Sequence, residues 1–176
     1  MIMGICGTYD LDSANGRMLE LLLSECRKLG AETLVWDHGA KPLPLVGAGG
    51  SWEDNNVKAF QDMASSSDAF VLSSPEYHGT MSGVMKNSLD WLYSKHTSGK
   101  VFGLMSTLGG QASNNTLNHM RIAARWIHGW VAPEQVAVPH IKEAFNEDGS
   151  LVNETIMERV RSLASSLVSN TRKLRR

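Results

Sequence analysis

The sequence has little cysteine and almost no excess of charge. Its 176 residues include only two cysteines, Cys6 and Cys26, too few for a disulfide framework and without the spacing of a zinc site. The 17 basic and 18 acidic side chains leave a net charge of -1, so no field gathers nucleic-acid phosphates. We therefore expect reduced thiols, a cytoplasmic location and no nucleic-acid partner.

Long apolar runs and familiar catalytic motifs are also missing. The first six residues lack the charged region and long apolar core of a signal peptide. The uncharged stretch 101–120 is broken by Gly109 and Gly110, which excludes a membrane span. No P-loop, GxGxxG turn, HExxH pattern or Ser-His-Asp order is present. These absences disfavour an NTPase, a Rossmann dehydrogenase, a metalloprotease and a membrane partner.

Short apolar runs alternate with longer segments of helical periodicity. We expect strands at Ile2–Cys6, Glu32–Trp36, Ala69–Ser73, Val101–Ser106 and Val131–Val138. We expect helices at Gly16–Leu29, Asn55–Ser65, Gly83–Lys95, Ala112–His128 and Glu154–Leu174. Ser82 and Asn153 are predicted N-caps, and Gly30 a C-terminal cap. The alternation predicts one α/β domain over residues 1–176, with a parallel sheet and helices on both faces.

Three loops that follow predicted strands have complementary chemistry, and ligands of open parallel sheets bind at that edge. Residues 7–15 offer hydroxyls, amides and a helix start, which suit a phosphate; equally, Ser13 or Asn15 is a simple helix cap. Residues 74–83 combine a proline, glycines and an aromatic side chain, as a platform for a planar ligand does. Residues 106–110 add hydroxyls and bare backbone. A phosphate pole, an aromatic wall and a glycine-lined edge are what FMN requires.

A specific motif resembles that of a known family. Pro75-Glu76-Tyr77 through Gly83, followed by Lys86-Asn87 and Asp90-Trp91, resembles the PEYN…G.LKNAIDW segment of NAD(P)H-dependent FMN reductases. Their GSxRxxSxN loop is similar to residues 7–15, and residues 107–110 and 145–151 are similar to further segments of theirs. The resemblance spans almost the whole chain. It implies a flavodoxin-like three-layer sandwich whose five parallel strands have the order 2-1-3-4-5.

The resemblance also implies a cofactor and the residues that hold it. FMN would be the cofactor, and NADPH or NADH the co-substrate. Thr8, Ser13 and Asn15 would hold the phosphate, Pro75, Glu76, Tyr77 and His78 would line the isoalloxazine, and Thr107, Gly109 and Gly110 would lie at its polar edge.

The expected reaction is a ping-pong cycle in which the flavin carries the redox chemistry, so that no acid–base pair is needed. Hydride passes from the nicotinamide to the flavin, and a small acceptor then takes two electrons. Quinones, azo compounds, chromate, ferric complexes and free flavin all fit. The resemblance further implies a homodimer or homotetramer with the third and fourth helices at the interface. Trp91 and Trp126 are candidates for that interface or for the core.

The chain departs from the family at several positions. Asp10 stands where the family commonly has arginine, with Asp12 nearby, and two carboxylates pointing inward would repel a phosphate. We hypothesise that Arg17, on the first helical turn, replaces that arginine. His78 replaces a common asparagine and Ser82 a common proline.

Two other functions compete with an FMN reductase. A flavodoxin-type electron carrier shares the fold, but such carriers are usually strongly acidic, unlike this nearly neutral chain. A flavodoxin-like scaffold without FMN is suggested only by Asp10 and Asp12.

Overall fold

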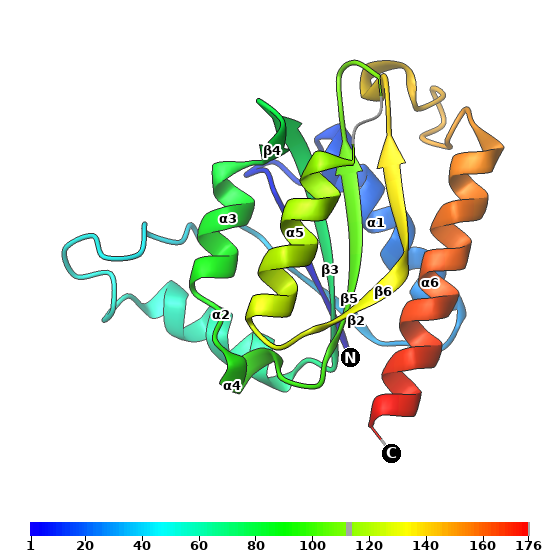
Figure 1. Cartoon of the computed structure of the whole chain (residues 1–176). Helices are drawn as coiled ribbons and strands as arrows, with labels where there is room; N and C mark the ends of the chain where they lie inside the picture. Colours follow the sequence, from blue (N-terminus) through cyan, green and yellow to red (C-terminus); the bar gives the residue numbers. More distant parts are fainter. Residues whose placement is uncertain (112–113, 176) are drawn as a thin grey trace.

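Five parallel strands form the centre of the computed structural model, which describes residues 1–111 and 114–175 (Figure 1). They are β1 (Ile2–Cys6), β2 (Thr33–Trp36), β3 (Ala69–Tyr77), β5 (Val101–Thr107) and β6 (Trp130–Val138). Their order across the sheet is β2-β1-β3-β5-β6, and every neighbouring pair is parallel. This arrangement confirms the predicted order 2-1-3-4-5 and the flavodoxin-like class.

A short sixth strand, β4 (Thr80–Met81), folds back antiparallel on β3 and was not predicted. The prediction that β3 ends at Ser73 is wrong, because its ladder with β5 continues as far as Pro75 opposite Thr107. The two turn residues, His78 and Gly79, have φ angles of +51° and +80°. A two-residue hairpin loop with both φ angles positive is a type I′ turn, in which asparagine is preferred and histidine is tolerated before glycine. His78 thus occupies a backbone position that also suits asparagine.

Helices cover both faces of the sheet (Figure 1). α1 (Ala14–Lys28) and α6 (Glu154–Leu174) pack on one face through an apolar cluster that includes Leu19 and Leu163. α2 (Asn55–Ser66), α3 (Gly83–Asp90) and α5 (Asn115–Trp126) pack on the other. There Phe70 and Phe102, from neighbouring strands, stack with ring centroids 4.6 Å apart. The short α4 (Ser94–Thr97) and a 3-10 turn at Ile141–Glu143 complete the described elements.

The predicted helix caps are confirmed, but one predicted helix is wrong. The side chain of Ser82 accepts from the Met85 amide, that of Asn153 accepts from the Ile156 amide, and Gly30 has a φ of +78°. The predicted helix Gly83–Lys95 is divided into α3 and α4. The Trp91 carbonyl there accepts from the Gln61 side chain at 2.9 Å, in place of a helical amide.

The start of the predicted helix Ala112–His128 lies on residues 112–113, outside the described part of the chain. From Asn115 onward the helix is confirmed as α5, although it ends at Trp126, two residues early. His128 has a φ of +67°, which lies outside the helical region. Among the helices of residues 1–111 and 114–175, none is both long and apolar enough to cross a membrane.

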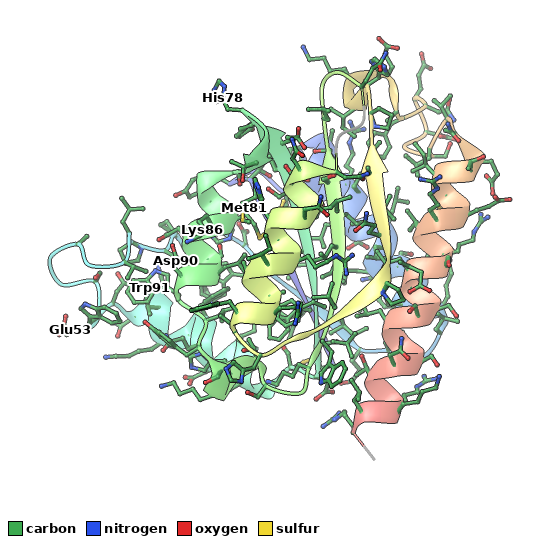
Figure 2. All side chains as sticks on the ribbon, in the orientation of Figure 1. Glu53, His78, Met81, Lys86, Asp90 and Trp91 are labelled. Carbon is green, nitrogen blue, oxygen red and sulfur yellow. The ribbon has the colours of Figure 1, made fainter. Side chains whose placement is uncertain are left out.

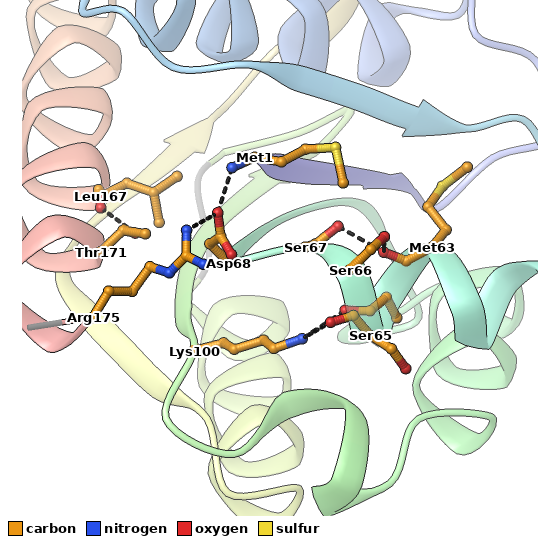
Figure 3. A network of polar contacts seen from close by, with 11 residues as sticks. Met1, Met63, Ser65, Ser66, Ser67, Asp68, Lys100, Leu167, Thr171 and Arg175 are labelled. Carbon is orange, nitrogen blue, oxygen red and sulfur yellow. Dashed lines mark hydrogen bonds and ion pairs between the residues drawn. The ribbon is translucent and has the colours of Figure 1, made fainter.

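Charged groups bind the amino end of the sheet together (Figure 3). One carboxylate oxygen of Asp68, just before β3, lies 2.5 Å from the Met1 ammonium and 2.5 Å from a guanidinium nitrogen of Arg175 at the end of α6. Lys100, just before β5, donates to two carbonyls at the end of α2 at 2.8 Å. These contacts join β1, β3, β5 and two helices at the edge opposite to the candidate ligand loops.

His38 is a buried titratable group beyond the end of β2, with only 2% of its surface exposed. Its Nε2 lies 3.1 Å from the Ser88 hydroxyl. That hydroxyl donates to the Val84 carbonyl at 2.8 Å and therefore accepts from Nε2. Burial lowers the pKa of His38 to about 4, although the neighbouring Asp37 carboxylate opposes the shift.

Stability is therefore expected to decrease as the pH falls from about 6.5 toward 4, the ordinary and the folded pKa of this group. In that window the unfolded chain binds the proton and the folded chain does not, so the free energy of unfolding falls by up to about 3 kcal/mol. His38→Gln retains a donor but does not titrate. Urea unfolding at several pH values should show a weaker acid dependence for His38→Gln, and identical profiles would contradict the assignment.

Candidate functional site

The side chain of Asn15 joins three strands at the carboxyl edge of the sheet. Its Nδ2 donates to the Ser73 carbonyl at 2.8 Å and to the Cys6 sulfur at 3.2 Å. Its Oδ1 accepts from the hydroxyls of Ser73 at 3.0 Å and Thr107 at 3.3 Å. Asn15 is only 3% exposed. The ends of β1, β3 and β5 are thus fixed to the start of α1, and only the backbone N–H of Asn15 is left to hold a phosphate.

The loop after β1 leads into a helix start with free backbone donors. The Thr8 hydroxyl donates to the Asp10 carbonyl at 3.0 Å and lies 3.0 Å from the Ser13 hydroxyl. The Ser13 hydroxyl accepts from the Gly16 amide at 3.1 Å, so Ser13 is also the helix cap. Within the described residues, the amides of Ala14 and Asn15 have no protein acceptor. Such first-turn donors suit a phosphate.

Close backbone packing shapes this loop. A Cβ at Gly16 would lie 2.1 Å from the Leu11 carbonyl oxygen, so the loop crosses the helix start only because residue 16 is glycine. One carboxylate oxygen of Asp10 accepts from the Asp12 amide at 2.8 Å, which closes an Asx turn. That bond commits an oxygen of Asp10 to the loop itself, and both acidic residues are solvent-exposed.

The fourth predicted phosphate partner, Arg17, lies one turn into α1. Its backbone amide donates to the Ser13 carbonyl at 2.9 Å. Its guanidinium carbon lies 4.3 Å from the ring centroid of Phe145, a residue of the segment after β6. The ring contact was not predicted, because nothing in the sequence brings residues 17 and 145 together.

The loop after β3 is a hairpin anchored on α5. Glu76 points to the start of that helix, where its carboxylate accepts from the Thr116 amide at 3.4 Å. The second strand of the hairpin, β4, is held by a contact of 2.7 Å between the Thr80 hydroxyl and Nδ1 of His119 on α5. Tyr77 is 55% exposed, and His78 lies at the tip, pointing away from the domain (Figure 2). Pro75, by contrast, is buried within the β3–β5 ladder.

Ser82 connects this hairpin to the first loop. Its hydroxyl donates to the Gly7 carbonyl at 2.6 Å, and its amide donates to the Ser74 hydroxyl at 3.0 Å. A Cβ at Gly7 would lie 3.0 Å from the Pro75 ring and from the Ser74 Cα. Proline at position 82 has neither donor. The departure from the family at this position therefore joins two of the three candidate loops.

The loop after β5 provides the open edge. The Thr107 hydroxyl is committed to Asn15, and the side chain is only 3% exposed. Gly109 and Gly110 are exposed, and a Cβ built on either would meet nothing within 4 Å. The Gly110 carbonyl accepts from the His140 amide at 2.9 Å, which fixes the loop to the segment after β6.

A separate apolar groove of about 460 Å³ runs between α3 and α5. It is lined by Met81, Leu89, Ile122, Trp126 and Ile127, with polar ends that include Lys86, Asp90 and His119. Figure 2 shows Lys86 and Asp90 on α3, where they form a 2.6 Å ion pair. Trp126 is 84% exposed, whereas Trp91 is fully buried and donates to the Pro44 carbonyl at 2.8 Å. Of the two tryptophans, only Trp126 is free to meet another molecule.

Comparison with known proteins connects this geometry to a family. Residues 1–143 match the family model for NADPH-dependent FMN reductase. A relative from Staphylococcus aureus, FMN-dependent NADPH-azoreductase, is 30% identical over 172 residues, which cover 94% of this chain and 92% of the relative.

Two solved structures show the same fold. FerB, a flavoenzyme NAD(P)H:(acceptor) oxidoreductase from Paracoccus denitrificans, superposes with a TM-score of 0.82 at 21% identity, covering 98% of this chain and 97% of FerB. An archaeal flavodoxin superposes with a TM-score of 0.64 at 11% identity, covering 99% and 98% of the two chains.

Removal of the Asn15 carboxamide is expected to destabilise the fold. Asn15→Leu has similar volume but removes the side-chain partner of the Thr107 hydroxyl and one of the two bonds of the buried Ser73 carbonyl, which keeps the Gly7 amide at 2.7 Å. The Ser73 hydroxyl keeps only the Asn15 backbone carbonyl at 3.3 Å. We therefore expect the free energy of unfolding to fall by about 1–3 kcal/mol. Asn55→Leu, at an exposed position of α2, is the matched control and should change it by less than about 0.5 kcal/mol. Urea denaturation measures both variants, and equal stability of the two would contradict this role of Asn15.

Proposed function

This chain belongs to the family of NADPH-dependent FMN reductases, and from that membership we propose a ping-pong reductase of small acceptors. Membership makes the chain an oxidoreductase whose cofactors are FMN and NADPH. The observation that supports our assignment of the site is the junction at Asn15, which gathers the ends of β1, β3 and β5 around one helix start. We treat residues 1–176 as one FMN-binding domain.

The residues at this edge fit FMN. Free amides at the start of α1 match a phosphate, and the bare backbone at Gly109 and Gly110 leaves room for a flat ring edge. We therefore propose the full predicted set as the binding residues: Thr8, Ser13, Asn15 and Arg17 at the phosphate, Pro75, Glu76, Tyr77 and His78 along the isoalloxazine, and Thr107, Gly109 and Gly110 at its edge. When bound, FMN supplies the two-electron redox chemistry that side chains lack.

The protein's own groups act by positioning. The Glu76 carboxylate is committed to the start of α5, so it orients the hairpin rather than moving a proton. The exposed ring of Tyr77 offers a stacking surface to a planar substrate. We propose that NADPH and the acceptor use the same open face in turn, which requires NADP+ to leave before the acceptor binds. Azo compounds and quinones are the first acceptors to test, followed by chromate, ferric complexes and free flavin.

NADPH is expected to bleach the visible flavin absorption of the FMN-loaded protein without air, and an azo dye or quinone is expected to restore it. Parallel NADH titrations measure the nucleotide preference. Initial rates at varied acceptor concentrations should give parallel double-reciprocal lines. Intersecting lines would contradict the shared face. A flavin-loaded protein that NADPH leaves unchanged would indicate an electron carrier, and a protein that takes up no FMN would indicate a scaffold.

We also propose a cytoplasmic homo-oligomer. Both cysteines are free and buried, as is usual for proteins of a reducing compartment. Burial raises the pKa of the Cys26 thiol to about 12, which keeps this thiol unreactive. The groove between α3 and α5 combines an apolar lining with two exposed side chains, Ile122 at 65% and Trp126 at 84%. A homodimer that covers this groove is the smallest assembly that explains the exposure.

Trp126→Glu is expected to convert the dimer into a monomer, because a carboxylate would be buried in an apolar interface. Val152→Glu is the matched control, since Val152 is 59% exposed and lies in the segment before α6. Analytical ultracentrifugation distinguishes the states. A wild-type monomer, or a Trp126→Glu protein that remains dimeric, would exclude this interface.

A further inference from the structure

We infer that Phe145 is a positioning residue that holds Arg17 beside the phosphate pole of the FMN site. The inference rests on the proposed function, because it assigns a role toward FMN. It explains how this chain binds a phosphate although Asp10 occupies the position where the family commonly has arginine.

Arg17 is placed by the helix itself. It lies in the first turns of α1, two residues after Asn15 and its free amide. Side chains of a helix lean toward its N-terminus, which is the end of α1 that follows the loop with Thr8 and Ser13. The residue is exposed to solvent, so an entering ligand can reach it.

Phe145 is held by its own turn. It forms a bridge with Leu151, and the Asn146 amide donates to the Ser150 carbonyl at 2.8 Å. The Asp148 carboxylate closes the turn by accepting from the Ser150 hydroxyl at 2.6 Å. The ring is half-buried and packs against the apolar cluster between the sheet, α1 and α6. Phe145 is thus a fixed surface on which the Arg17 side chain can rest.

The contact leaves the guanidinium able to bind an anion. At 4.3 Å from the ring centroid, the cation lies over the face of Phe145, within cation–π range. Stacking occupies the face of a guanidinium and leaves its N–H edges free for phosphate oxygens. The neighbouring Glu20 pairs with Arg27, and among the described ion pairs none involves Arg17. Arg17 is therefore a positioned cation without a carboxylate partner.

The test compares flavins with and without a phosphate. FMN and riboflavin are titrated into flavin-free protein and followed by flavin fluorescence. Arg17→Gln should weaken FMN binding about 10- to 100-fold, as expected for a lost charge-assisted hydrogen bond, and leave riboflavin binding unchanged.

Phe145→Leu should weaken FMN binding about 2- to 5-fold, the magnitude of a cation–π contact. The double variant should bind FMN no more weakly than Arg17→Gln alone. Arg159→Gln, at an exposed position of α6, is the charge-matched control.

Salt dependence gives a second readout that needs no riboflavin binding. FMN affinity should fall less steeply with salt in Arg17→Gln than in the wild type, because one phosphate contact is lost. Equal FMN affinity and equal salt dependence in wild type and Arg17→Gln would overturn the inference, as would additive effects of the two substitutions. In that case a wild type that still binds FMN retains the proposed function. A wild-type protein that binds no FMN would contradict both the role of Arg17 and the proposed function.

Discussion

The buried carboxamide of Asn15 is the constraint on which the rest of the site depends. Its bonds reach Cys6, Ser73 and Thr107, so three strand ends have fixed positions relative to the start of α1. A buried amide that lost these partners would be costly, so the strand ends cannot shift independently. The first loop must then pass close to α1, and glycine at position 16 makes room for it. The residue at position 16 is thus the one that the close approach of the loop requires.

The motif that identifies the family proves to be largely structural. Glu76 caps α5, His78 and Gly79 form a type I′ turn, and Ser82 bonds the first loop. These residues set the shape of the hairpin and present backbone and the Tyr77 ring at the sheet edge. A family motif beside the proposed cofactor site can thus encode positioning as much as contact.

The sequence predicted the strands, their order and most helices because these depend on periodicity and local caps. It failed where distant residues decide the backbone. β3 extends beyond Ser73 because β5 pairs with it as far as Pro75 and β4 pairs with Glu76 and Tyr77. Where α3 ends, the Trp91 carbonyl accepts from the distant Gln61 side chain. Within the site, the predicted residues lie on the expected loops, but the role of the Asn15 side chain depends on three strands at once. The contact between Arg17 and the Phe145 ring could not be predicted either, because the two residues are far apart in the sequence and meet only in the folded chain.

We propose that the start of α1 is the one site at which this protein binds the phosphate of FMN. Titration of isotope-labelled protein with FMN, followed in amide NMR spectra, tests this most directly because each amide reports separately. We expect large shifts at the amides of Ala14 and Asn15, together with shifts in residues 75–79 and 107–110, and little change at Asp68 on the opposite edge. Unchanged signals from Ala14 and Asn15 in a protein that binds FMN would contradict it.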